Sequence, residues 1–220
     1  MSTAGPFTSG LWHKPPPEAY LNRAAPGTRK RQPPSVLTRE EVMRLVDQCD
    51  PTTRTGLRDR ALIVLLYRTG LRCAEALDLK PSDINYTHAT VTVLSGKGGK
   101  RRVVGIDRKA LDEIREWADA RAKLGYPPGT PLFCTKRGTR IYGGQVRSRL
   151  KVLQKQAGIT TRVHAHGFRH THARELLAEG VPIYAIQKQL GHTRLHTTAI
   201  YLNHAVDGAD PVPVISRRAW

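Results

Sequence analysis

An unbroken apolar run, Ala61 to Leu66, lies in the first third of this 220-residue chain. The surrounding segment, residues 57–68, has helical composition and is apolar on nearly every side, which predicts a helix buried at the centre of a domain. Gly70 follows it, and glycine is the residue that most often ends a helix in the left-handed conformation. The rest of the folded chain is therefore expected to pack around this helix.

The elements expected around this helix are mostly helical. Thr38 and Glu41 have the spacing of a capping box, and apolar residues at helical spacing follow them. Residues 89–94 and 101–106 have strand composition, and the three glycines between them predict a hairpin. We expect a short helix beginning near residue 72, a short strand at 131–134, and helices at 108–124, 143–157, 167–179, 182–190 and 195–203. The predicted fold class is mainly α with a small antiparallel β-sheet (α+β).

The chain is strongly basic. It carries 36 Lys and Arg residues against 18 Asp and Glu residues, which gives a net charge of +18. Such an excess repels itself in a compact protein, so it favours a polyanionic partner, and nucleic acid fits this best. A soluble basic protein without such a partner is the alternative on charge alone.

Cysteine usage and hydropathy limit the location of the protein. Cys49, Cys73 and Cys134 are scattered, which argues against a disulfide framework or a zinc knuckle and favours a reducing cytosol. The sequence has no apolar run of membrane-spanning length and no apolar signal core at its N-terminus. We therefore expect a cytoplasmic protein without a membrane partner.

Composition divides the chain into three parts. Residues 1–36 hold seven of the 15 prolines, few aliphatic residues and a basic cluster, which predicts a disordered or extended tail that tracks phosphates. Residues 37–205 are expected to form the folded domain, and residues 206–220 a separate C-terminal segment.

Several residues of the folded domain suit the chemistry of a phosphodiester. Arg72 and Arg169 have planar guanidinium groups that grip phosphate oxygens, and each is expected at the start of a helix, where anions are favoured. His166 lies three residues before Arg169, and a neutral imidazole there can accept a proton. The phenol of Tyr201 is a candidate nucleophile, and Lys97 at the hairpin tip is a candidate proton donor.

Each of these residues alone has a plainer explanation. A surface ion pair is the usual fate of an arginine, packing that of a tyrosine, and solvent exposure that of a turn lysine. Histidines at positions 164, 166, 170 and 172 suggest a metal site, but their spacing lacks the pattern of a hydrolytic zinc site and no Cys or acidic residue joins them. We therefore expect core or catalytic histidines and no metal.

In this order, the residues resemble the tyrosine recombinases, also called phage-type integrases. The resemblance runs from about Leu37 to Ala205. It rests on five segments: Thr69-Gly-Leu-Arg-Cys-Ala-Glu75, the hairpin with Lys97, His166-Gly-Phe-Arg-His170, Leu190-Gly-His192, and Tyr201 after Thr197 and Thr198. It implies the tyrosine recombinase (phage integrase) catalytic-domain fold, the fold of DNA breaking-rejoining enzymes.

The resemblance also implies a role for each residue of the site. Those roles are contacts with the non-bridging oxygens for Arg72, Arg169 and His192, proton acceptor for His166, general acid for Lys97, and nucleophile for Tyr201. Glu75 is implied to orient Arg72, and the alternative, a simple ion pair with that arginine, overlaps with this role. No cofactor is implied, because a covalent link to the enzyme conserves the energy of the phosphodiester.

The implied function is site-specific DNA recombination through a 3′-phosphotyrosyl intermediate, by a monomer that assembles as a tetramer on two duplexes. Nicking and resealing like that of a type IB topoisomerase, and a non-catalytic DNA-binding regulator, are the alternatives. Family members usually carry a helical DNA-binding domain before the catalytic one, where this chain has residues 1–36, so an accessory DNA-binding protein is a further expected partner. The segment 206–220 is expected to pack on a neighbouring protomer, and the protein to be associated with the nucleoid.

Six basic residues are candidates for contacts with DNA. Three share one face of the helix predicted at 143–157 at four-residue spacing, a fourth lies beside them, and two begin the second strand of the predicted hairpin. In chain order they are Arg101, Arg102, Arg147, Arg149, Lys151 and Lys155. A plain solvated face explains the helix nearly as well.

Overall fold

A computed structural model describes residues 35–94 and 101–192. The predictions that concern Lys97, Tyr201, the helix at 195–203, the tail before residue 35 and the segment 206–220 lie outside the described residues. Within the described ranges, no helix is both long and apolar enough to cross a membrane.

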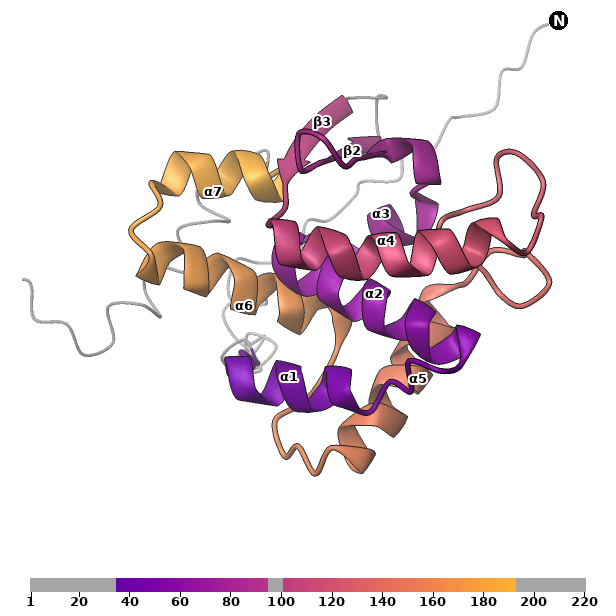
Figure 1. The fold of residues 1–220 in the computed structure, drawn as a ribbon. Helices are drawn as coiled ribbons and strands as arrows, with labels where there is room; N and C mark the ends of the chain where they lie inside the picture. The colour runs from indigo at the N-terminus through magenta and orange to yellow at the C-terminus, as the bar shows by residue number, and fades with distance from the viewer. Residues whose placement is uncertain (1–34, 95–100, 193–220) are drawn as a thin grey trace, which may run out of the picture. The chain divides into compact units, whose positions relative to one another are not determined.

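The apolar segment forms the central helix, as predicted. This helix, α2 (Arg54–Thr69), packs against α1 (Arg39–Asp47), α4 (Arg108–Ala122) and α6 (Ala165–Ala178). Figure 1 shows α4 on one side of α2 and α1 on the other, with α6 at its C-terminal end. Three neighbours require apolar residues on several sides of one helix, which is why α2 lacks a polar face along most of its length.

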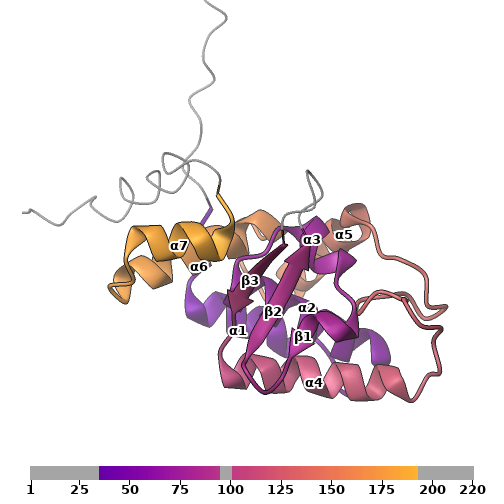
Figure 2. The same ribbon diagram turned by 90° about the horizontal axis from the view of Figure 1, so that it is seen from above.

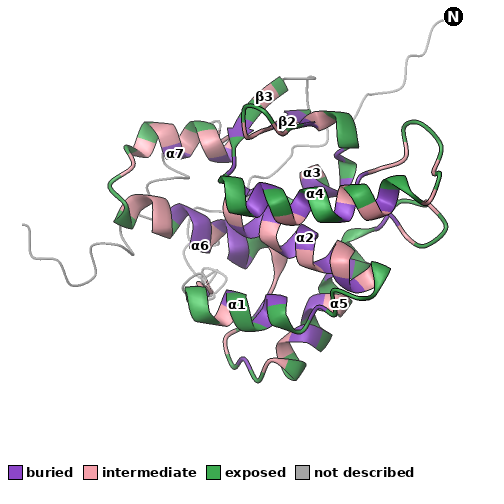
Figure 3. Ribbon diagram, viewed as in Figure 1, coloured by how far each residue is buried: buried purple, intermediate pink, exposed green. Residues whose placement is uncertain are grey.

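Burial along α2 follows from these contacts. Ala61, Leu62 and Ile63 are successive residues that point to different sides of the helix, yet none is more than 4% exposed. Figure 3 shows buried segments on α2 where its neighbours pack, and green segments mainly on the outer helices. Gly70 ends α2 with φ +64°, which confirms the left-handed cap.

The capping box at the start of α1 is also confirmed. Thr38 Oγ1 accepts a hydrogen bond from the Glu41 backbone N–H at 3.2 Å, and Glu41 Oε2 accepts one from the Thr38 N–H at 2.9 Å. Two backbone donors at the helix end are satisfied in this way.

A three-stranded antiparallel sheet contains the predicted hairpin. Its order is β1 (Ile84–Asn85), β2 (Thr90–Leu94) and β3 (Arg101–Gly105), and β1 was not foreseen. Val91 lies opposite Val104 in the β2–β3 register, and both are fully buried. Because side chains alternate along a strand, one face of this sheet joins the core and the other faces outward.

The strand expected at 131–134 is wrong. These residues form only an isolated bridge, between Cys134 and Arg140. The Leu132 N–H donates to the Leu79 carbonyl at 2.6 Å, and the Leu132 carbonyl accepts from Trp117 Nε1 at 2.9 Å. The backbone of this apolar segment is thus satisfied by a loop and a helix side chain, so it needs no neighbouring strand.

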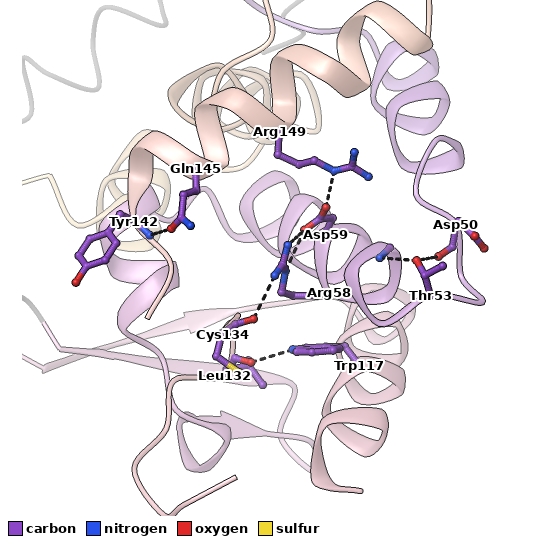
Figure 4. Close-up of polar contacts among 11 residues, drawn as sticks. Asp50, Thr53, Arg58, Asp59, Trp117, Leu132, Cys134, Tyr142, Gln145 and Arg149 are labelled. Carbon is purple, nitrogen blue, oxygen red and sulfur yellow. Dashed lines mark hydrogen bonds and ion pairs between the residues drawn. The ribbon is translucent and has the colours of Figure 1, made fainter. Parts of the chain in front are cut away.

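The basic helix α5 (Gly143–Gln156) is fastened to α2 by one buried carboxylate. Asp59 is 5% exposed and pairs with Arg58 Nη2 at 2.7 Å and with Arg149 Nε at 2.6 Å. Arg58 Nη1 also donates to the Cys134 carbonyl at 3.2 Å. Figure 4 shows the three side chains meeting between the two helices. Two guanidinium groups satisfy the charge that burial would otherwise make costly.

The last described helix, α7 (Ile183–Leu190), packs on α6 and on the edge strand β3. Its Gln189 amide accepts from the Gly105 N–H at 3.1 Å and donates to the Gly105 carbonyl at 2.9 Å. Figure 2 shows α7 beside the β3 side of the sheet. An otherwise open strand end is therefore paired, and the turn after α7 is held close to the sheet.

Candidate active site

Arg72 lies at the N-terminus of α3 (Cys73–Asp78), as predicted. Its backbone N–H and its Nη1 donate to Glu75 Oε2 and Oε1, each at 2.9 Å, and Nη2 donates to the Gly191 carbonyl at 3.4 Å. The Arg72 side chain is 47% exposed. It is thus oriented on one side and open to solvent on the other.

Arg169 is placed differently from the prediction. It lies in the second turn of α6 and not at its start, and it is only 1% exposed. Its Nη1 donates to the Gly70 carbonyl at 2.7 Å. The last carbonyls of a helix carry partial negative charge, so the C-terminal end of α2 provides a binding place for this guanidinium.

The start of α6 is held by a histidine that the sequence analysis left without a role. His164 Nδ1 accepts a hydrogen bond from the Gly167 N–H at 3.0 Å and so acts as the N-cap. The spacing, an acceptor three residues before the donor, is that of an ordinary cap, but histidine is not among the usual capping residues. His166 lies two residues after this cap, in the first turn of α6.

A cleft of about 680 Å³ lies between the start of α3, the start of α5 and the start of α6. The polar residues that line it are Arg72, Arg147, Arg162, His164 and His166. Among the described residues that form its walls, none is acidic. A cleft lined by one sign of charge attracts the opposite sign, and this one suits an anion.

The two histidines expected in the site are neutral at pH 7. Partial burial, together with the positive charges of Arg169, His164 and Arg72, lowers the pKa of His166 below its usual 6.5. Burial and then Arg169 and Arg72 lower the pKa of His192 to about 4. A neutral imidazole can accept a proton at one nitrogen and donate a hydrogen bond from the other. His166 also contacts the His170 ring, with centroids 4.4 Å apart.

Glu75 is ionised and pairs with Arg72. Burial opposes its ionisation, but hydrogen bonds from Arg102 and Arg72 outweigh that effect and lower the pKa of Glu75 to about 2. Arg102 supplies two of these bonds, at 2.9 and 2.8 Å. Arg102 is one of the residues predicted to contact DNA, and its pairing with Glu75 was not predicted.

The structure separates the six DNA-contact candidates into two groups. Arg102 donates from both terminal nitrogens to Glu75, and Arg149 donates from Nε to Asp59, so each of these two residues holds a carboxylate of the fold. The remaining four are exposed at the surface, and Arg147 lines the cleft as well. They are Arg101, Arg147, Lys151 and Lys155.

In residues 35–94 and 101–192, no three histidine, cysteine or acidic side chains lie close enough to one another to hold a metal ion.

The fold and the site together define a class of protein, and a family model gives its name. The model of the phage integrase family matches residues 35–207. The chain belongs to this family.

Individual relatives carry the same description. The chain is 38% identical to tyrosine recombinase XerA of Thermococcus kodakarensis over 188 residues, which are 84% of this chain and 64% of that protein. It is 36% identical to tyrosine recombinase XerC of Shewanella oneidensis over 156 residues, 71% of this chain and 49% of that protein. The chain thus spans between half and two thirds of the length of these curated relatives.

Solved structures show the same fold. A crystal structure of XerA recombinase aligns with a TM-score of 0.73 at 29% identity, covering 86% of this chain and 67% of the other. A post-cleavage complex of XerH site-specific recombinase bound to palindromic difH substrate gives 0.72 at 26%, covering 85% and 54%. A lambda integrase dimer on a core site, at 20% identity and a TM-score of 0.63, is similar in fold.

Proposed function

We propose that this protein breaks and rejoins DNA at specific sites through a covalent 3′-phosphotyrosyl intermediate on Tyr201. The observation that carries the proposal is the convergence of residues from three distant segments. Arg72 donates to the carbonyl of Gly191, the residue before His192, and Arg169 donates to the carbonyl of Gly70, two residues before Arg72. These contacts bring together segments that span 120 positions of the chain, from 72 to 192. Family membership and the recombinase relatives support strand exchange over the topoisomerase and regulator alternatives.

The chemistry assigns one step to each group. The Tyr201 oxygen attacks the scissile phosphorus, its proton passes to His166, and the bond from phosphorus to the 5′ oxygen breaks. Arg72, Arg169 and His192 stabilise the charge that develops on the non-bridging oxygens. Lys97 protonates the leaving 5′ oxygen. The reverse reaction with a 5′ hydroxyl from another strand restores the phosphodiester and regenerates the tyrosine.

Double-stranded DNA is the proposed partner. Three observations suit it: the net charge of +18, the cleft whose described lining is basic, and the four exposed basic residues. The solved XerH relative is bound to its difH substrate. We propose that monomers assemble as a tetramer on two duplexes and that residues 206–220 pack on a neighbouring protomer. An accessory protein assists binding to DNA. The protein works in the cytoplasm, at the nucleoid. Salt should weaken its binding to non-specific DNA steeply.

The nucleophile is tested with nicked DNA substrates that trap the covalent intermediate, because the nicked fragment diffuses away after cleavage. Duplexes cut from the DNA that flanks the gene serve as the library. The wild type should form a labelled protein–DNA adduct, and Tyr201→Phe should abolish it while leaving DNA affinity unchanged. Tyr184→Phe, at a tyrosine that is 61% exposed on α7, is the matched control and should retain the adduct. An adduct in Tyr201→Phe refutes the assignment.

Strand exchange is tested separately from cleavage. Two duplexes of different length that carry the mapped site are incubated with the protein, and products that join one duplex to the other are measured. Joined products mean recombination. Relaxation of a supercoiled plasmid without joined products means the topoisomerase alternative.

A further inference from the structure

Arg102 is the residue whose contacts the proposed mechanism does not use. It lies near the start of β3, and its Nη1 and Nη2 donate to Glu75 Oε1 and Oε2 at 2.9 and 2.8 Å. The side chains are 16% and 10% exposed, respectively. Two parallel bonds between a guanidinium and a carboxylate fix both position and angle, and burial protects them from competing water.

Glu75 transmits this fixation to Arg72. The same two carboxylate oxygens also accept hydrogen bonds from the backbone N–H and from Nη1 of Arg72. Arg72 is about half exposed, and an exposed Arg–Glu pair on its own orients a side chain only weakly. Here Arg102 already fixes the Glu75 carboxylate, so less conformational entropy is lost when Arg72 binds to it.

Arg102 also touches the turn that precedes His192. A Cβ placed on Gly191 would lie 2.7–2.9 Å from Nε, Cζ and Cδ of Arg102, so the Gly191 backbone packs directly on the guanidinium. The Gly191 carbonyl accepts the 3.4 Å bond from Arg72 Nη2. Arg102 therefore contacts the Arg72–Glu75 segment and the Gly191–His192 turn at the same time.

We propose that Arg102 is a positioning residue. It holds Arg72 and His192 in the relative positions that let both side chains bind the same phosphate. It acts through Glu75 and Gly191 and ties both to strand β3, which follows the hairpin segment that contains Lys97. This inference rests on the proposed function. It replaces the earlier interpretation of Arg102 as a DNA contact, because both of its terminal nitrogens are already engaged.

The test measures the rate of adduct formation in a single turnover at saturating nicked DNA, and the dissociation constant separately. Arg102→Gln should slow adduct formation by about 100-fold, because small misplacements of a catalytic group have effects of that order. Its dissociation constant for DNA should stay within about threefold of the wild type, because the interactions that bind DNA before the reaction are unaffected. Arg102→Lys should remain about tenfold slow, because one ammonium cannot make two parallel bonds. Arg115→Gln removes the same charge at an exposed site on α4 and should match the wild type.

Two further measurements identify the residues through which Arg102 affects the rate of adduct formation. The double variant of Arg102→Gln and Glu75→Gln should be no slower than Glu75→Gln alone, because residues that act through one another are not additive. A substrate with sulfur as the bridging 5′ atom has a leaving group that needs no proton. The Arg102→Gln defect should persist on it, because Arg72 and His192 act on the non-bridging oxygens.

Other results overturn the proposal. If Arg102→Gln binds DNA weakly but reacts normally at saturation, Arg102 is a DNA contact. If Arg102→Lys reacts like the wild type, charge alone suffices, and if the sulfur substrate restores the rate, the effect runs through the general acid. Thermal unfolding of each variant is followed by circular dichroism, and rates are measured where every variant is folded. If the wild type itself forms no adduct, it is the proposed function that fails.

Discussion

Replacing Glu75 by Gln tests the electrostatic core of the site without changing its shape. The variant keeps an oxygen acceptor and a similar volume, but it leaves Arg72 and Arg102 without a negative partner. The Glu75 side chain is 10% exposed, so water replaces little of what is lost. We therefore expect a loss of stability that is large for a single polar substitution.

The magnitude follows from the pKa of Glu75. Burial opposes ionisation, yet the bonds from Arg102 and Arg72 lower the pKa from 4.5 to about 2. At about 1.4 kcal/mol for a tenfold change in an equilibrium, this lowering corresponds to about 3 kcal/mol of stability. A carboxylate with a lowered pKa contributes all of this stability above pH 4.5, the unfolded value, and loses it as the pH falls through about 2.

Urea unfolding of wild type and Glu75→Gln between pH 7 and pH 3 measures this effect. The difference in unfolding free energy should be about 3 kcal/mol at pH 7 and about 1 kcal/mol at pH 3, because below pH 4.5 the unfolded chain takes up a proton on Glu75 that the folded wild type takes up only near pH 2. Glu116→Gln, at an exposed position of α4, is the control and should change stability by less than about 0.5 kcal/mol. A difference under about 1 kcal/mol at pH 7, or one that stays constant with pH, refutes the reasoning.

Three further predictions concern other parts of the site. Gly191→Ala should lower the unfolding free energy by about 1–3 kcal/mol, because φ is +68° and the new Cβ meets a guanidinium, whereas Gly144→Ala in open space on α5 should raise it by about 0.5–1 kcal/mol. Arg149→Gln should lower the unfolding free energy in urea by about 2 kcal/mol without changing DNA affinity. Lys151→Gln should weaken DNA binding without changing stability, and its slope of log K against log salt should be smaller by about 0.9. The rate of adduct formation should fall at acid pH with a midpoint below 6.5, because protonated His166 cannot accept a proton, and a midpoint at or above 6.5 contradicts this.

Local signals in the sequence predicted most of the elements. The apolar segment of α2, its glycine cap and the capping box of α1 each depend on residues within a few positions of one another, and all three are confirmed. The strand at 131–134 failed because its composition describes burial, while the partners of its backbone, Leu79 and Trp117, lie far away in the sequence. Composition indicates that such a segment is inside, but not what its backbone bonds to.

For the basic residues of the candidate site too, the sequence pattern indicates burial but not the bonding partner. Arg102 shares a strand face with Val104, which is fully buried, so alternation along β3 already placed it toward the interior. Arg149 lies three residues after buried Val146 and four before buried Leu153, so the helical period placed it at the edge of the core. The carboxylates that receive these arginines come from α3 and α2, and no local pattern reveals them.

The two arginines that we propose as catalytic, Arg72 and Arg169, each donate a hydrogen bond to the carbonyl at the end of a helix from another segment of the site. Arg169 donates to the carbonyl of Gly70, two residues before Arg72, and Arg72 donates to the carbonyl of Gly191, the residue before His192. Both glycines end helices with positive φ, so their carbonyls combine partial negative charge with a conformation that other residues adopt only under strain. Carbonyl partners hold a guanidinium without placing a full negative charge beside the phosphate. Within the described ranges, Glu75 is the carboxylate that pairs with Arg72, and it is neutralised by a second arginine, Arg102. The site can therefore be rigid and still attract an anion.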